Sequence, residues 1–400
     1  MSVRAIPALH SRLEQRHGRF VMDVWLLGVA IALLALGLVM VMSASMSIAE
    51  RQMGNSFYYF LRQATFVGLG LFSAYIVLQI RLVYWERVGP YFLLFGLALL
   101  LLVLLAGREI NGSVRWLVLG PINLQPSELM KLFMVIYLAG YLVRRGEEVR
   151  NTVKGFLKPM SLVLLVGLLL LLEPDFGATA VIMATVLGMM FLGGVRLWQF
   201  ALLFLFMSGA AVVLTLSSPY RLERITSFVN PWADPFNSGF QLTQALIAFG
   251  RGEWLGVGLG GSIQKLFYLP EAHTDFLFAV LAEELGLLGV LLVLTLFGIL
   301  VWRVFVIGQA ALRGGNCFGA YTAFGVGLWL GLQSFINMGV NMGVLPTKGL
   351  TLPLMSYGGS SIVVSCIACA LVLRVSHESP VKKYPAARRA PAVGTRRVRK

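Results

Sequence analysis

Long apolar runs constrain this chain more than any other feature of its sequence. The first run, 24–42, is apolar throughout, and several runs of similar length follow it. About 18 or more such residues are needed to cross the hydrocarbon of a bilayer, and inside lipid only a helix or a closed barrel satisfies the backbone. The runs are continuous rather than alternating, which favours helices. Only 13% of the residues are charged, about half the share of a soluble domain, so lipid must solvate much of the surface.

The runs predict an all-α, polytopic inner-membrane bundle of about ten spanning helices. The predicted spans are 21–42, 60–80, 88–106, 126–143, 159–172, 177–194, 197–216, 276–302, 318–343 and 360–375. The first span is long enough to be a retained helix rather than a cleaved signal peptide. Pro and Gly within 173–177 predict a tight turn between the fifth and sixth spans.

The distribution of charge predicts the orientation of the bundle. An even number of spans places both termini on one side, and that side carries most of the Lys and Arg of a chain with a net charge of +15. Positive charge favours the cytoplasm, so both termini are predicted to be cytoplasmic. Topology therefore accounts for the basic balance, and we expect no nucleic acid partner. The periplasmic side then holds 107–125, 344–359 and a long loop at about 217–275, in which 239–249 is predicted to be an amphipathic helix.

The chain is predicted to have three parts. Residues 1–20 form a cytoplasmic N-terminal segment, 21–375 form the transmembrane domain, and 376–400 form a basic cytoplasmic tail that we expect to be disordered. The three cysteines all fall in apolar segments, which indicates helix packing and predicts no disulfide. A long loop without function is uncommon, so we expect the functional site in the periplasmic loop of the transmembrane domain.

Polar side chains inside predicted spans are costly and therefore informative. Gln333, Asn337 and Asn341 recur every four residues and share one helix face. They either form interhelical hydrogen bonds that hold the bundle together or line a polar cleft that opens outward. Glu128 and Lys131 have the spacing of a helical ion pair, which favours a structural role.

Two further acids, Glu283 and Glu284, fall in the eighth predicted span. On a straight helix they lie roughly 12 Å along the axis from Asp275 at about 1.5 Å per residue. That depth in the membrane favours a buried structural pair over catalysis. Adjacent buried acids need partners, and Lys131 is one candidate.

Asp275 is the carboxylate best placed for a reaction at the membrane surface. It stands at the outward end of the eighth predicted span, where an Asp is also an ordinary helix cap. His273 is a second candidate base. Glu271, His273 and Asp275 alternate along the chain and are weak candidate ligands for a divalent cation, Mg²⁺ or Mn²⁺.

Cations on the predicted periplasmic side are candidate ligands for an anion. The set comprises Arg221, Arg224, Arg251, Lys265 and Lys348. They are either solvated interface anchors or a site for pyrophosphate, where they would stabilise charge on a leaving group.

Five motifs give the chain a family likeness. They are LQPSELMK at 124–131, EPDFG at 173–177, NPW with DP at 230–235, QKLFYLPEAHTDFLFAVLAEELG at 264–286 and NMGVLPTKGLTLPLMSYGGSS at 341–361. They resemble the signatures of the SEDS family, the shape, elongation, division and sporulation proteins of bacterial cell-wall synthesis. The likeness runs from about residue 20 to 375. It is stronger to the division branch of the family than to the elongation branch, its close sibling.

The resemblance implies a ten-helix peptidoglycan glycosyltransferase that works at the division septum with its active site on the periplasmic face. Its substrate would be lipid II, the undecaprenyl-pyrophosphate-linked disaccharide pentapeptide, polymerised into β-1,4 glycan strands with inversion. Its partners would be a class B penicillin-binding protein transpeptidase and other membrane proteins of the division machinery. The family's catalytic aspartate falls on Asp275, and the lysine of its PTKGLTLP motif falls on Lys348.

These expectations leave three functions open. In the polymerase, Asp275 is the predicted general base, and the predicted substrate-binding residues are Lys348, His273, Arg221, Arg224 and Asn341. A lipid II flippase or other transporter would also need many helices and a polar stripe. A non-enzymatic scaffold of the division machinery would rely on the loops and the tail.

Overall fold

The apolar runs form the long helices of the computed structural model, which describes residues 22–379 apart from 111–112, 121, 197, 201–204, 206–208, 210–227, 229, 238 and 347–348. The helices that match predicted spans are α2 (Val24–Met53), α3 (Tyr58–Gln79), α4 (Leu82–Ala106), α5 (Pro126–Asn151), α6 (Val153–Leu172), α7 (Phe176–Leu192), α11 (Leu277–Arg313), α12 (Cys317–Asn341) and α13 (Gly359–Glu378). In the described part of the chain, 8 helices are long and apolar enough to cross a membrane, and α7 is a shorter apolar helix. The predicted span 197–216 lies mostly outside the described residues. The chain is a multi-pass helical membrane protein.

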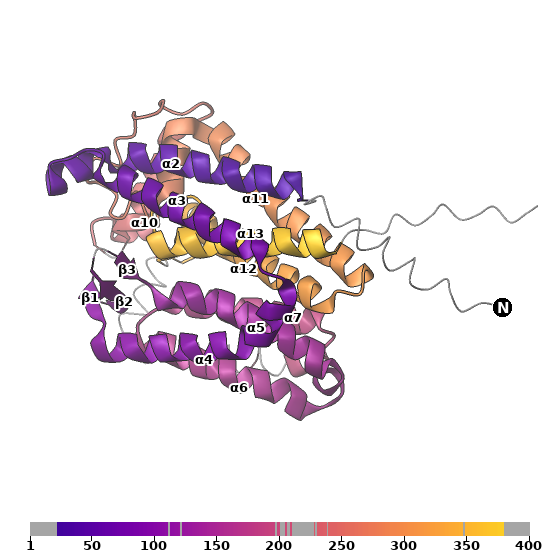
Figure 1. Ribbon diagram of the computed structural model, residues 1–400. Helices are drawn as coiled ribbons and strands as arrows, with labels where there is room; N and C mark the ends of the chain where they lie inside the picture. The colour runs from indigo at the N-terminus through magenta and orange to yellow at the C-terminus, as the bar shows by residue number, and fades with distance from the viewer. Residues whose placement is uncertain are drawn as a thin grey trace, which may run out of the picture.

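The helices run between two ends of the bundle, and Figure 1 shows a small sheet at one of them. We call this the sheet end. Helix α13 begins near the sheet and ends at the opposite end, where α2 begins (Figure 1). The two ends of the described chain therefore share one end of the bundle, as an even number of spans requires.

The sheet was not predicted from the sequence. Strands β1 (Arg108–Ile110), β2 (Ser113–Leu119) and β3 (Ile122–Leu124) pair antiparallel in the order β1-β2-β3. Two of the strands have only 3 residues each, too few for an alternating pattern to be visible in a predicted loop. The hydroxyl of Ser360 at the start of α13 accepts from the Gln125 backbone N–H at 3.0 Å, which ties α13 to the beginning of α5.

Close packing of α11 against α12 fixes their register. A Cβ added at Gly308 would meet the ring of Phe324, and one added at Gly331 would meet Val301. The two helices are therefore antiparallel, and each step along α12 matches a step back along α11. Continued at about 1.5 Å per residue, this register would place Asn341 level with roughly residue 291 of α11.

Helix α11 nevertheless changes direction at Gly286. This residue has φ 63° and ψ −162°, a non-helical conformation inside the helix. The Ala279 N–H donates to Asn341 Oδ1 at 3.0 Å, so Ala279 lies at the end of α12. The register of the two helices places residue 291 at the same level. A straight helix would separate residues 279 and 291 by about 18 Å. The segment 277–285 must therefore turn across the rest of α11.

This turn corrects the predicted depth of Glu283 and Glu284. They do not lie on a straight helix below Asp275 but on the reoriented segment at the sheet end. Glu283 forms an ion pair with Arg251 at 2.8 Å, and Glu284 forms one with Lys265 at 2.7 Å. The prediction of Lys131 as a partner for these acids was wrong, because Lys131 forms its ion pair with Glu128 within α5. The predicted structural role of the two acids agrees with these contacts.

The predicted amphipathic helix at 239–249 is present as α10 (Phe240–Gly252), which follows a short 3₁₀ helix, η1 (Pro231–Ala233). Helix α10 packs against the 277–285 segment. The approach is close at Gly252, where an added Cβ would lie 2.0 Å from the Ala282 carbonyl oxygen. The described part of the long loop is therefore folded onto the start of α11.

Candidate active site

Asp275 closes a turn that leads directly into α11. The Phe276 N–H donates to the Glu271 carbonyl at 3.2 Å, and the Thr274 hydroxyl donates to Glu271 Oε2 at 2.6 Å. These bonds give the turn a defined shape before the helix begins. They place the Asp275 side chain at the sheet end of the bundle.

The backbone of Asp275 is held from behind by the polar face of α12. Asn337 Nδ2 donates to the Asp275 carbonyl at 2.9 Å, and Asn341 Nδ2 donates to the same oxygen at 3.0 Å. Asn341 also accepts from Ala279 in the first turn of α11. Of the two readings left open by the sequence, these contacts are interhelical hydrogen bonds. Asn341 is fully buried, and its contacts are with the protein itself.

The carboxylate of Asp275 has no hydrogen-bond donor among the described residues. Its Oδ2 lies 3.0 Å from the position that a Cβ on Gly349 would occupy, so the loop backbone passes close to it. Burial is the main cause that raises the pKa of Asp275 to about 7, with Glu271 adding to the rise and Arg115 opposing it. A carboxylate of this kind can accept a proton near neutral pH.

His273 belongs to a cluster of three rings beside Asp275. Its ring centroid lies 4.8 Å from that of Tyr59 and 5.3 Å from that of Tyr357. The Tyr357 N–H donates to the His273 carbonyl at 3.0 Å, which fixes the loop before α13 against this turn. Burial lowers the pKa of His273, so its imidazole is neutral at pH 7. Its Nδ1 has no hydrogen-bond partner among the described residues.

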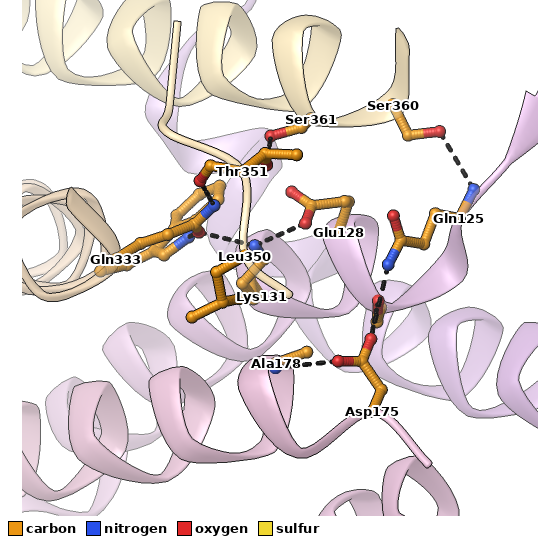
Figure 2. Close-up of polar contacts among 12 residues, drawn as sticks. Gln125, Glu128, Lys131, Asp175, Ala178, Gln333, Leu350, Thr351, Ser360 and Ser361 are labelled. Carbon is orange, nitrogen blue, oxygen red and sulfur yellow. Dashed lines mark hydrogen bonds and ion pairs between the residues drawn. The ribbon is translucent and has the colours of Figure 1, made fainter. Parts of the chain in front are cut away.

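Asp175, one of the two acids in the 173–177 turn, bonds to residues at the starts of two helices, α7 and α5. Asp175 caps α7 by accepting from the Ala178 N–H at 3.1 Å, and it accepts from the Ser127 hydroxyl at 2.9 Å. Gln125, just before α5, also approaches it at 3.4 Å. Figure 2 shows Asp175 between the beginnings of α5 and α7, with Ser360 of α13 on the other side of Gln125.

The same turn packs against the loop that passes Asp275. A Cβ added at Gly177 would lie 2.8 Å from Leu350 Cγ, so the 173–177 turn and the loop before α13 are in contact. Arg115 of β2 donates to the carbonyls of Glu173 and Pro174. Glu173 is fully buried, and burial raises its pKa to about 8. Neither of its carboxylate oxygens has a hydrogen-bond partner among the described residues.

The predicted pair of Glu128 and Lys131 is confirmed, and it extends to α12. Lys131 Nζ lies 2.8 Å from Glu128 Oε1 and donates to Gln333 Oε1 at 2.6 Å. Gln333 in turn donates to the Thr351 carbonyl at 2.9 Å. Figure 2 shows this chain of contacts running from α5 through α12 to the loop before α13. The loop beside Asp275 is therefore connected through Gln333 to the buried ion pair of Glu128 and Lys131.

The structure does not test all the predicted cations. Arg221, Arg224 and Lys348 lie outside the described residues. Lys265 is buried in its ion pair with Glu284. Its role is therefore structural rather than the pyrophosphate contact considered from the sequence, and Arg251 is likewise engaged by Glu283.

The described residues do not supply the predicted metal ligands as a set. Glu271 is engaged by Thr274, and the His273 ring packs against two tyrosines. In the described part of the chain, no three or more His, Cys, Asp or Glu side chains lie together in a group that could hold a metal ion. The divalent cation therefore stays a prediction, and we assign no step to one.

Sequence reasoning missed several residues that surround Asp275. Tyr59 and Tyr357 come from segments far apart in the chain, and nothing in their local patterns marks them. The place of Arg115 beside the site was not predicted, because strand β2, which carries it, was not predicted. Glu173 and Asp175 did carry a signal, since two acids flank a proline between apolar runs, but that signal was used only to predict a turn.

The fold and this site define a class: a multi-pass membrane protein with a partly buried carboxylate at one end of its helical bundle. The family model for cell cycle proteins of the FtsW, RodA and SpoVE type matches residues 24–380. The chain belongs to this family, and the resemblance to SEDS proteins is confirmed.

Relatives and solved structures agree with this assignment. The chain is 64% identical over 363 residues to a probable peptidoglycan glycosyltransferase FtsW of Nitrosococcus halophilus, covering 90% of this chain and 94% of the relative. It is 56% identical to the protein of the same description from Methylococcus capsulatus, covering 95% and 96%. A chain from a structure on polymerization and crosslinking by a peptidoglycan synthase complex has a TM-score of 0.75 at 33% identity, covering 90% and 99%. The rod shape determining protein RodA of Thermus thermophilus has a TM-score of 0.67 at 31% identity, covering 90% and 98%.

Proposed function

We propose that this chain is a peptidoglycan glycosyltransferase that polymerises lipid II, with Asp275 as its general base. The observation that carries the assignment is the state of Asp275. Its backbone is clamped by two amides of α12, while its carboxylate has no described hydrogen-bond donor. Its pKa is raised to about 7. A rigidly held base with that pKa suits proton abstraction at neutral pH.

The chemistry follows from the bond that must form. The 4-hydroxyl of the acceptor sugar is a poor nucleophile unless its proton leaves during attack. A positioned carboxylate that takes this proton contributes typically about 10²–10⁴-fold to the rate. The α-linked lipid pyrophosphate leaves from the opposite face, so a β-1,4 bond forms with inversion. As in inverting glycosidases, one displacement needs a base and no covalent enzyme intermediate.

Substrate binding is assigned to the groups around this carboxylate. His273 presents a neutral imidazole within the aromatic cluster, which can contact a sugar ring or donate to a hydroxyl. Lys348 follows the polar end of α12 in sequence and adjoins Gly349, so we assign it, with Arg221 and Arg224, to the charge of the leaving pyrophosphate. We assign Asn341, predicted as a substrate contact, to positioning Asp275.

The sheet end faces the periplasm in this proposal. Both ends of the described chain lie at the opposite end of the bundle, and the positive charge of the sequence segments 1–20 and 376–400 favours the cytoplasm for that end. The similarity to a peptidoglycan synthase complex and to FtsW relatives supports a class B penicillin-binding protein as the transpeptidase partner. It also supports action at the division septum together with other division proteins.

A lipid II flippase is less well supported. Such a transporter needs a polar pathway across the membrane, and the stripe on α12 was its best sequence feature. In the structure the amides of Gln333, Asn337 and Asn341 donate to carbonyls of neighbouring segments. The stripe therefore serves packing.

The deciding experiment is polymerisation of lipid II by the purified protein, alone and with its transpeptidase partner. Asp275→Asn keeps the shape of the side chain but removes the base, so we expect glycan strands from the wild type and none from the variant. Glu253→Gln, at an exposed acid elsewhere in the same loop, is the matched control and should polymerise normally. Full activity of a folded Asp275→Asn protein would refute the assignment.

A further inference from the structure

The segment from Trp254 to Tyr268 has its polar and apolar side chains reversed relative to a loop in water. The side chains of Trp254, Leu255 and Leu259 are 71%, 75% and 60% exposed. Glycines aside, every exposed residue of this segment is apolar or aromatic, and its polar residues Ser262, Gln264 and Lys265 are all buried. A surface loop of a soluble domain shows the opposite pattern, with its polar side chains exposed and its apolar side chains buried. A large exposed apolar patch of this kind marks an interaction site.

The side chains of Lys265 and Ser262 bond to the two adjacent acids of α11. Lys265 pairs with Glu284 at 2.7 Å, and the Ser262 hydroxyl donates to Glu283 at 2.5 Å. The backbone N–H of Gln264 also donates to the Glu283 carboxylate, at 3.3 Å. The charges of both acids are therefore turned inward, and the outer surface of the segment is left without charge.

Backbone groups of the segment form hydrogen bonds with backbone groups on either side of the break in α11. The N–H groups of Val257 and Gly258 donate to the carbonyls of Glu283 and Glu284, at 3.0 and 3.1 Å. In return, the Leu288 N–H beyond the break donates to the Trp254 carbonyl at 3.2 Å. Non-helical backbone is tolerated at membrane depth only where protein groups pair with it, and this pairing supplies those groups.

The exposed apolar surface continues that of the membrane-spanning part of α11. Leu288, Leu291 and Leu292 follow the break and are about half exposed, as expected of a face toward lipid. Because Leu288 is bonded to the Trp254 carbonyl, the two apolar surfaces adjoin. Helix α12 is about 37 Å long at 1.5 Å per residue, against a hydrocarbon thickness of about 30 Å, so its end lies near the membrane surface. The segment is thus at the boundary between acyl chains and headgroups.

We propose that residues 254–268 form a re-entrant anchor that inserts its apolar side chains into the lipid leaflet at the sheet end. The occupant of this surface is phospholipid: acyl chains around Leu255 and Leu259, and the interface around the amphipathic rings of Trp254 and Tyr268. The Arg51 guanidinium, 4.8 Å from the centre of the Phe267 ring, lies at the rim where headgroup phosphates would be. This inference does not depend on the proposed reaction.

Spin labels at single cysteines test the proposal in liposomes containing the full chain. The background replaces Cys317, Cys366 and Cys369 by alanine, and labels are placed at positions 255 and 259. We expect collisions with oxygen to dominate over collisions with a water-soluble nickel chelate at both positions. A label at Leu94, exposed on α4, is the lipid reference, and one at Asn237, exposed in the same long loop, is the aqueous reference.

A second measurement avoids labels at the segment itself. The fluorescence of Trp254 is obtained as the difference between wild type and Trp254→Phe, and bromine-substituted lipids should quench most of it. Labels at 255 and 259 that collide mainly with nickel, together with Trp254 emission quenched by aqueous iodide, would overturn the proposal. Shielding that arises only after a second protein is added would also overturn it, because the surface would then be a protein interface.

Discussion

The side-chain amide of Asn341 donates to the carbonyl oxygen of Asp275 at 3.0 Å. The same residue accepts from Ala279 on the next turn, so one buried side chain joins the end of α12 to the proposed base and to the start of its helix. The contact involves the backbone of Asp275 and leaves the carboxylate unbonded. Asn341 therefore fixes where the acid stands without competing for its oxygens.

Replacing Asn341 should lower turnover more than substrate affinity. Asn341→Ala removes both contacts, and a displacement of the base by about 1 Å can cost up to about 10²-fold in rate. We expect kcat to fall by about 10- to 100-fold while KM for lipid II changes little. Steady-state polymerisation assays measure the two quantities separately. A rise in KM at unchanged kcat would instead make Asn341 a substrate contact, as the sequence suggested.

The pH dependence of the reaction should report the raised pKa of Asp275. Its folded pKa is about 7, and only the ionised form accepts a proton, so kcat/KM should rise as pH increases through about 7 and level off above it. The profile is measured on lipid II below saturation, with protein stability checked at each pH. A rate that is flat from about pH 5 to pH 8 would contradict a base of this pKa.

Removing one partner of the ion pair between Glu128 and Lys131 should lower stability more than replacing both partners by uncharged residues. Lys131→Met leaves a buried carboxylate without its cation, which costs about 3–5 kcal/mol. The double variant Glu128→Gln with Lys131→Met removes both charges and should recover much of that loss. Thermal unfolding of the purified protein in one detergent compares the three proteins. Equal losses in the single and double variants would rule out this account.

Glu173 should make stability depend on pH in a way that Gln does not. Its folded pKa is about 8 against an ordinary value of 4.5. The folded state thus binds more protons than the unfolded state between those values, and stability falls as pH rises through that window. The uncharged amide of Glu173→Gln cannot titrate, so its unfolding temperature should fall less than that of the wild type between about pH 5 and pH 8. Parallel curves for the two proteins would show that Glu173 has a solvated pKa.

The break in α11 should be sensitive to a single methyl group. A Cβ at Gly286 would lie 2.4 Å from the Gly256 backbone nitrogen, and its φ of +63° disfavours other residues. Gly286→Ala should therefore destabilise the protein and reduce polymerisation. The control is Gly298→Ala on the same helix, where nothing lies within 4 Å of the added atom and the change should be neutral or stabilising by up to about 1 kcal/mol. Similar behaviour of the two variants would mean that the break is not structurally required.

Much of this fold could be predicted from the sequence because lipid imposes long, uninterrupted signals. Nine of the ten predicted spans correspond to described helices, from α2 to α13. The sheet could not be predicted, since strands of 3 residues are too short for periodicity. The reorientation at Gly286 also escaped, because apolar residues stand on both sides of Glu283, Glu284 and Gly286, so that 276–302 has the pattern of one span. That error placed Glu283 and Glu284 deep in the membrane.

The candidate site was predictable only in part. Asp275 stood out as an acid at a span boundary, but an ordinary helix cap has the same pattern, and the family likeness was needed to favour catalysis. The clamp on its carbonyl depends on packing between α11 and α12. The rings of Tyr59 and Tyr357 depend on contacts across the whole chain. The polar face of α12 was visible in the sequence but its contact with Asp275 was not, and the two tyrosines carried no local signal.

The proposed base also determines how the enzyme would begin its next cycle. A carboxyl group with an ordinary pKa releases a proton readily but is a weak base. A carboxyl group with a pKa near 9 would instead stay protonated after the product has dissociated. At about 7, Asp275 is matched to the pH of the surrounding water and can return the proton there by itself. The proposed base would then be regenerated between successive sugars by proton exchange with the surrounding water.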